Sequence, residues 1–246
     1  MNNYRRGKHV KLRKRGLYDP FMEKGACGVG LVANVKGVAS YELLENAKTM
    51  LLGMAHRGAT VRETGDGAGL MARIPHDLYK QKLKKSYDID LPPEGRYATG
   101  IIFTDTKDVI IAKSRFTEIC SEYGLEILCW RNVPVNNDAI GPAARYDEPF
   151  ILQVFVVLKD PTVDFFQQLL VIRKQASAKI LEEIDRFYIV SISAKIIVYK
   201  GRFDAAQLWE YYLDLHDPLF ITNFAIVHAR FATNTFPTWE LAQPFR

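Results

Sequence analysis

A cysteine in GACGVG, residues 25–30, has surroundings that suggest chemistry. A thiol acts as a nucleophile only when it is partly ionised or when a base takes its proton. One candidate base for Cys27 is a distant histidine. His228, in IVHARF, is the histidine on a predicted buried strand, where such residues usually belong to the core. The other candidate is the α-amine of Cys27 itself. Cleavage after Ala26 would free this amine, whose pKa is ordinarily about 7.7–8.0.

An arginine in an apolar run is the second such residue. Arg230 lies in NFAIVHARFATN, which is predicted to form a buried strand. A buried guanidinium needs an anionic partner, because an unpaired buried charge is costly. Either a carboxylate of the protein pairs with Arg230, or Arg230 binds a substrate carboxylate through two parallel hydrogen bonds.

Other motifs point away from nucleotide or metal chemistry. The glycine-rich TGDGAG, residues 64–69, lacks the spacing of a phosphate-binding loop. It instead predicts a tight turn that brings the backbone close to another segment. No CxxC or HxxxH spacing occurs, so no metal site is predicted. Cys120 and Cys129 lie in a predicted helix and a predicted strand, and we interpret both as structural thiols.

Composition limits the classes of partner. The net charge is +5, but residues 1–26 contain eight basic and two acidic residues, so the rest of the chain is nearly neutral. A neutral body argues against nucleic acid as a partner. No apolar run approaches the ~20 residues of a membrane span, and the basic start is not followed by the apolar segment of a secretory signal. We expect a cytoplasmic protein, with the plastid as the alternative compartment.

Apolar periodicity predicts interleaved helices and strands. Residues 40–58 form a predicted helix with Ser40 as N-cap and Gly58 at its end, and further helices are predicted at 76–86, 163–183 and 204–215. FYIVSIS and AKIIVYKG are two adjacent apolar runs that predict a hairpin. Many strands are apolar on both faces, which favours sheets covered by helices in layers.

Several collinear blocks carry a family resemblance. LYDPFMEKGACGVGLVANVKG, MAHRGAT and TGDGAGL are followed by WRNVPVNNDAIGPAAR, EPFILQVFV, FYIVSISAKIIVYKG, LWEYYLDLHDP and VHARFATNTFPTWELAQPFR. Together they resemble the start of the large subunits of glutamate synthases, where a short propeptide ends at a catalytic cysteine. The resemblance runs from about Leu17 to Arg246.

The resemblance implies a class II glutamine amidotransferase domain. Its fold would be α+β, a four-layer αββα sandwich of the N-terminal-nucleophile (Ntn) hydrolase type. Its reaction would be hydrolysis of L-glutamine to glutamate and ammonia, with ammonia passing to 2-oxoglutarate in the full enzyme. FMN and an iron–sulfur cluster are implied for the other domains of that synthase, and no cofactor is implied for this chain.

The same resemblance assigns roles to four residues. Cys27 matches the nucleophile. Arg230 and Thr233, in HARFAT, match a segment in which the arginine binds the glutamine α-carboxylate and the threonine helps to hold the substrate. Arg57, in HRG, matches a residue close to the nucleophile.

The expected organisation is a basic propeptide at residues 1–26 and a partial amidotransferase domain at residues 27–246. The sequence departs from the family by a loop of four residues, TVRE, where about six are expected. It also stops at QPFR, before the family's oxyanion-hole segment, so the sandwich is expected to be incomplete at the C-terminus. Two alternatives stay open. One is a catalytically incomplete fragment or remnant, and the other is a class II amidotransferase that feeds a different acceptor.

Overall fold

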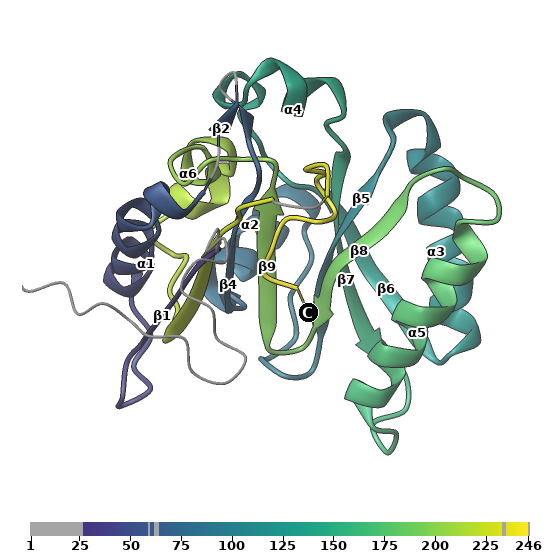
Figure 1. The fold of residues 1–246 in the computed structure, drawn as a ribbon. Coiled ribbons are helices and arrows are strands. Elements are labelled where there is room, and N and C mark those ends of the chain that lie inside the picture. The colour runs from purple at the N-terminus through teal and green to yellow at the C-terminus, as the bar shows by residue number, and fades with distance from the viewer. Residues whose placement is uncertain (1–26, 59, 62–63, 233–234, 246) are drawn as a thin grey trace, which may run out of the picture.

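Two four-stranded antiparallel sheets form the centre of the molecule (Figure 1). The computed structural model describes residues 27–58, 60–61, 64–232 and 235–245. Sheet 1 has the strand order β1-β10-β4-β9 and sheet 2 the order β6-β7-β5-β8. The strands of sheet 1 are β1 (Gly28–Ala33), β10 (Phe224–Ala229), β4 (Ala68–Arg73) and β9 (Ile196–Gly201). Those of sheet 2 are β6 (Leu125–Asn132), β7 (Phe150–Leu158), β5 (Ala98–Thr104) and β8 (Phe187–Ser193).

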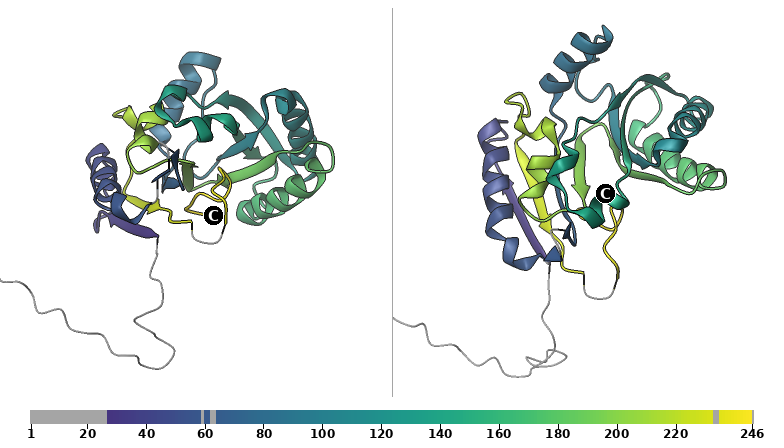
Figure 2. Two further views of the ribbon diagram at one scale, coloured as in Figure 1. Left: turned by 45° about the horizontal axis from the view of Figure 1, so that its top comes forward. Right: turned by 90° about the horizontal axis from the view of Figure 1, so that it is seen from above.

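Helices cover the outer sides of both sheets (Figure 2). Helix α1 (Tyr41–Gly53) packs on β1 and β10, and α3 (Val109–Glu122) and α5 (Phe165–Ile180) pack on sheet 2. This arrangement of α1, two sheets and an α3/α5 layer agrees with the predicted four-layer sandwich. The remaining elements are α2 (His76–Tyr87), α4 (Pro142–Tyr146), α6 (Gln207–Tyr211), the small pair β2 (Thr60–Val61) and β3 (Thr64–Gly65), and the 3₁₀ turns η1 (Ala55–Arg57), η2 (Thr106–Asp108), η3 (Asn137–Ala139) and η4 (Leu213–His216).

Local signals explain where the helices begin. The Ser40 hydroxyl accepts a hydrogen bond from the Leu43 N–H at 3.2 Å, as predicted for an N-cap. Helix α1 ends at Gly53, however, and Gly58 follows the separate turn η1. Asp204 begins the α6 region, but the predicted helix over 204–215 is divided into α6 and η4. The sequence pattern thus located the start of α1 correctly and placed its end too late, and it missed the break between α6 and η4.

The predicted β8–β9 hairpin is wrong. Strand β8 pairs with β5 in sheet 2, whereas β9 pairs with β4 in sheet 1. The chain passes between the sheets at a turn in which Ser193 Oγ accepts hydrogen bonds from the N–H groups of Lys195 and Ile196, at 3.1 and 3.3 Å. Two consecutive apolar strands look alike in sequence whether they pair or separate, because both faces are buried in either case.

A buried polar network links the two sheets. Arg131 on β6 donates to both carboxylate oxygens of Asp214, at 2.8 and 2.5 Å, and to Gln153 Oε1 at 2.7 Å. Tyr199 on β9 donates to Asp214 at 3.0 Å. Burial is the largest single influence on the Arg131 guanidinium and lowers its pKa, but the hydrogen bonds and opposite charge of Asp214 outweigh it, so that the pKa is raised. Such pairs are costly to break from one side, so the network ties β6 to β9.

Candidate active site

The pairing of β1 with β10 brings Cys27 to Arg230. Gly28 lies opposite Ala229 in this antiparallel pair. Cys27 and Arg230, the residues just beyond this pair, therefore meet at one end of the two strands. The backbone N–H of Phe231 donates to Cys27 Sγ at 3.4 Å, and the thiol lies 3.9 Å from the Phe231 carbonyl oxygen. Residues 204 positions apart in the chain are therefore in contact.

Arg57 lies beside Gly28, the residue that follows this cysteine. A Cβ added at Gly28 would lie 3.1 Å from Arg57 Cβ and 3.1 Å from Met54 Cβ, so the η1 region packs closely on the start of β1. Gly58 lies against the Arg230 carbonyl, 3.6 Å from the position of an added Cβ. The Arg57 side chain is exposed. The structure thus brings together three of the four predicted residues, Cys27, Arg57 and Arg230, while Thr233 lies outside the described residues.

The TGDGAG turn holds the Arg230 segment in place. The Arg230 N–H donates to the Gly67 carbonyl at 2.8 Å, and the Ala232 N–H donates to Asp66 Oδ2 at 2.6 Å. Arg230 Nη1 also donates to the Asp66 carbonyl oxygen at 3.4 Å. Gly67 has φ +148°, a backbone conformation that favours glycine. The prediction of a turn that brings the backbone close to another segment is confirmed. Sequence reasoning did not identify Asp66, although its place between two glycines was the available signal.

The Arg230 guanidinium is buried, and none of the carboxylates that the structure describes pairs with it. Its exposed fraction is 6%, and its Nη2 donates to the Thr235 hydroxyl at 2.7 Å. Within the part of the chain that the structure describes, its partners are this hydroxyl and the Asp66 carbonyl, both uncharged. The first reading of Arg230, a salt bridge within the protein, is therefore not found among these residues.

His228 and Lys200, two basic residues near Arg230, have lowered pKa values, which disfavour their charged forms. Burial is the main cause that lowers the pKa of His228 to about 4 and that of Lys200 to about 7, and the positive charge of Arg230 contributes to both shifts. His228 is buried, and its Nδ1 has no hydrogen-bond partner among the described residues. His228 is thus buried, as expected for a histidine of the core. The positive charge of Arg230, which disfavours protonation of both neighbours, makes this end of sheet 1 favourable for an anion.

The other thiols lie apart from the site. Cys120 is buried in α3 and Cys129 is half-buried on β6. Burial raises the pKa of Cys120 to about 12 and that of Cys129 to about 11, so neither is readily ionised.

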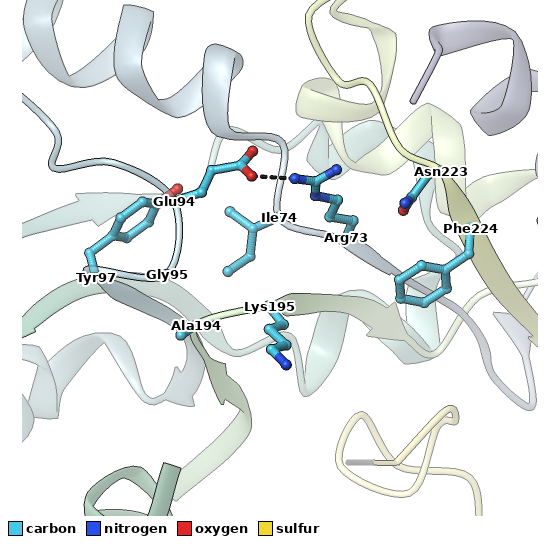
Figure 3. A pocket seen from close by; sticks show the side chains of 9 residues that line it. All are labelled: Arg73, Ile74, Glu94, Gly95, Tyr97, Ala194, Lys195, Asn223 and Phe224. Carbon is cyan, nitrogen blue, oxygen red and sulfur yellow. Dashed lines mark hydrogen bonds and ion pairs between the residues drawn. The ribbon is translucent and has the colours of Figure 1, made fainter. Parts of the chain in front are cut away.

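A pocket of about 400 Å³ lies at the opposite end of sheet 1 (Figure 3). Arg73, the last residue of β4, and Phe224, the first residue of β10, line it, and Arg73 is paired there with Glu94. Cys27 and Arg230 lie beyond the other ends of β1 and β10. The pocket therefore does not belong to the site around Cys27.

Metal-binding clusters and membrane-spanning helices are both absent from the described residues. These residues contain no group of three or more His, Cys, Asp or Glu side chains that could hold a metal ion. Among the helices that the structure describes, none is long and apolar enough to cross a membrane.

The amino-acid sequence of this chain matches a known protein family. The family of class II glutamine amidotransferases matches residues 27–246. The chain belongs to this family, and its two sheets and flanking helices are the Ntn-hydrolase fold of such a domain.

Curated relatives are glutamate synthases. The chain is 42% identical to the NADH-dependent glutamate synthase of Saccharomyces cerevisiae over 95% of its length, which is 12% of that protein. It is 40% identical to the large chain of the NADPH-dependent glutamate synthase of Bacillus subtilis, over 95% of this chain and 16% of that one. It is 38% identical to a chloroplastic ferredoxin-dependent glutamate synthase of Oryza sativa, over 94% of this chain and 15% of that protein. The chain thus spans only about a sixth or less of the length of these relatives.

Proposed function

We propose that this chain is the glutaminase part of a glutamate synthase, with Cys27 as an N-terminal nucleophile. The observation that carries the proposal is the contact of Cys27 with the Arg230 segment, in a family match that itself begins at residue 27. Residues 1–26 would be a propeptide removed by cleavage after Ala26. Residues 27–246 would then be the amidotransferase domain, or part of it.

The reaction would proceed through a thioester. Cys27 Sγ attacks the side-chain amide carbon of L-glutamine while the freed α-amine of Cys27 takes the thiol proton. The amine then returns this proton to the departing nitrogen, so that the C–N bond breaks and ammonia leaves. Water, deprotonated by the same amine, attacks the thioester, which releases glutamate and restores the thiol.

The charges of the site support the role of Arg230. Its buried guanidinium is partnered by uncharged oxygens, and it lies one residue before Phe231, whose backbone contacts Cys27. A glutamine whose α-carboxylate pairs with Arg230 would present its side chain along this edge of sheet 1. Arg57 beside Gly28, and Thr233, would complete the substrate contacts.

The later fate of ammonia would lie in other domains. A full synthase would add it to 2-oxoglutarate with FMN and an iron–sulfur cluster. A cluster of this kind needs several cysteine thiolates close together. Cys120 and Cys129 have raised pKa values, and no suitable group of ligands occurs in the described part of the chain, so these residues do not fit it. The compartment stays a prediction, cytoplasm or plastid.

Ammonia release from glutamine by the purified chain tests the proposal. We expect release that is lost in Cys27→Ala and kept in Cys129→Ala, which removes a half-buried thiol elsewhere. N-terminal sequencing of the active protein should begin at Cys27. Activity from a chain that still begins at Met1 would contradict the α-amine as base. A correctly matured chain that releases no ammonia would favour the catalytically incomplete fragment.

A further inference from the structure

Lys200 is a fully buried lysine that the proposed reaction does not use. It lies on β9 opposite Gly69 of β4, and Gly69 in turn lies opposite His228 of β10. Residues paired in this way point to the same face of the sheet. The exposed fraction of Lys200 is 0%. A lysine is almost never fully buried unless it is paired, so its partners must explain its position.

A segment near the end of the chain runs across this face. We call residues 239–245 the crossing segment; it lies alongside β9 in Figure 1. A Cβ added at Gly69 would overlap the Gln243 carbonyl oxygen and lie 2.9 Å from Pro244 Cδ. Gly69 therefore provides the space in which the crossing segment passes over β4.

Lys200 binds the crossing segment directly. Its Nζ donates to the carbonyl oxygens of Glu240 and Ala242, each at 2.8 Å, and to the Tyr188 hydroxyl at 3.1 Å. The ring centroids of Tyr188 and Phe245 lie 4.8 and 4.6 Å from this nitrogen. Protonated Lys200 has an acceptor for each of its three N–H donors, and the neutral amine, which the lowered pKa favours above pH 7, keeps two N–H donors for the two carbonyls.

The crossing segment borders Arg230. A Cβ added at Gly67 would lie 3.0 Å from Ala242 Cβ and 3.4 Å from Arg230 Cδ, so both side chains pack on the same point of the TGDGAG turn. Ala242, whose carbonyl Lys200 binds, thus supports the turn that holds Arg230. Two residues at the start of the segment are further anchors: Trp239 is buried and donates to the Ala144 carbonyl at 3.1 Å, and Glu240 pairs with Arg186.

We propose that Lys200 is a positioning residue, which fastens the crossing segment beside Arg230 and so sets the Arg230 side chain for the substrate carboxylate. The positioning of Arg230 for a substrate carboxylate rests on the proposed glutaminase function. The binding of the crossing segment by Lys200 does not.

The pKa of Lys200 supplies a distinctive signature. Burial lowers it to about 7, Glu240 opposes this shift, and Arg173 and Arg230 add to it. Tyr188 also faces the amine, and His228 lies across Gly69 from it. When the segment opens, Lys200 returns to water and to its ordinary pKa of about 10.4. Between pH 7 and pH 10 the open form thus binds more protons than the closed form, so falling pH favours opening.

Hydrogen–deuterium exchange of the whole chain tests the fastening. In the unaltered protein, we expect the opening constant of residues 239–245 to rise at least tenfold from pH 9 to pH 7, after correction for intrinsic exchange and relative to β5 amides. In Lys200→Met, the segment should lose at least tenfold in protection at pH 9 and lose this dependence on pH. Lys195→Met, at an exposed lysine just before β9, is the matched control and should change neither.

Unchanged protection of the segment in Lys200→Met would overturn the proposal. If that variant does not fold, protection that is independent of pH in the unaltered protein would overturn it equally. In an active chain, Lys200→Met should raise KM for glutamine more than it lowers kcat, and a loosened segment with an unchanged KM would refute the positioning role. Exchange needs no turnover, so a chain without glutaminase activity would disprove the proposed function and leave the fastening to be decided by exchange.

Discussion

Arg230 lies in a buried position, where oxygen atoms of the backbone and of a hydroxyl accept its hydrogen bonds. The Asp66 carbonyl and the Thr235 hydroxyl direct two of its nitrogens but do not neutralise it. Burial is the main cause of the lowered pKa values of His228 and Lys200, and the charge of Arg230 contributes to both shifts. An anionic group of a ligand would therefore stabilise this buried guanidinium strongly.

The variant Arg230→Lys tests this at the level of one residue. Lysine keeps the charge but cannot make the two parallel hydrogen bonds that a carboxylate accepts from a guanidinium. We expect glutamine to bind about ten- to a hundredfold more weakly, as for loss of a hydrogen bond to a charged group of about 1.5–3 kcal/mol. Calorimetric titration of glutamine into Cys27→Ala protein measures this without turnover. Arg145→Lys, on α4, is the control, and equal affinities would exclude the carboxylate role.

The TGDGAG turn and β4 work as one element that holds two other segments. On one side the backbone of Asp66 and Gly67 binds the Arg230 segment. On the other side, Gly65 lies so close to the chain that a Cβ there would overlap the Phe203 carbonyl group. The glycines of this element are needed because backbone, which cannot move aside as a side chain can, lies against them.

Gly65→Ala should therefore destabilise the fold. The added methyl group would force Phe203 and Asp204 away from the turn, and overpacking of this kind costs about 2 kcal/mol or more. Gly53→Ala is the matched control, because nothing lies within 4 Å of a Cβ there and alanine favours a helix. Urea unfolding of both variants measures the difference. Equal free energies of unfolding would mean that the turn adjusts without strain.

In the whole molecule, the face of sheet 1 turned away from α1 contains buried basic residues. His228 and Lys200 are both buried there, and burial lowers the pKa of each. Neutral His228 is therefore the form that the folded protein prefers. The unfolded chain, in which histidine has its ordinary pKa of about 6.5, binds more protons between pH 4 and pH 6.5.

Acid should consequently destabilise the protein through His228. As pH falls from 6.5 toward 4, the free energy of unfolding decreases by up to about 1.4 kcal/mol per pH unit from this group. At pH 5 the loss relative to pH 7 should be about 2 kcal/mol larger in the unaltered protein than in His228→Gln, because carboxylates contribute equally to both. Urea titrations at pH 7, 6 and 5 measure it, and parallel curves for the two proteins would contradict the lowered pKa.

The sequence by itself determined the family, the layered α+β class and most of the strands. Cys27 and Arg230 were recognisable because a thiol between small residues and an arginine in an apolar run are each unusual in their local context. Ser40 was recognisable as a helix start because capping depends on neighbours within three residues.

Tertiary structure alone decided what depends on residues far apart in the chain. The separation of β8 and β9 into two sheets, the support of Arg230 by Asp66 and the binding of the crossing segment by Lys200 all join distant positions. Composition and periodicity report local preference and burial, whereas partners are chosen by the path of the backbone. Lys200 shows this most clearly: in VYKG it reads as an ordinary strand lysine, and only the chain that crosses Gly69 makes it a buried one.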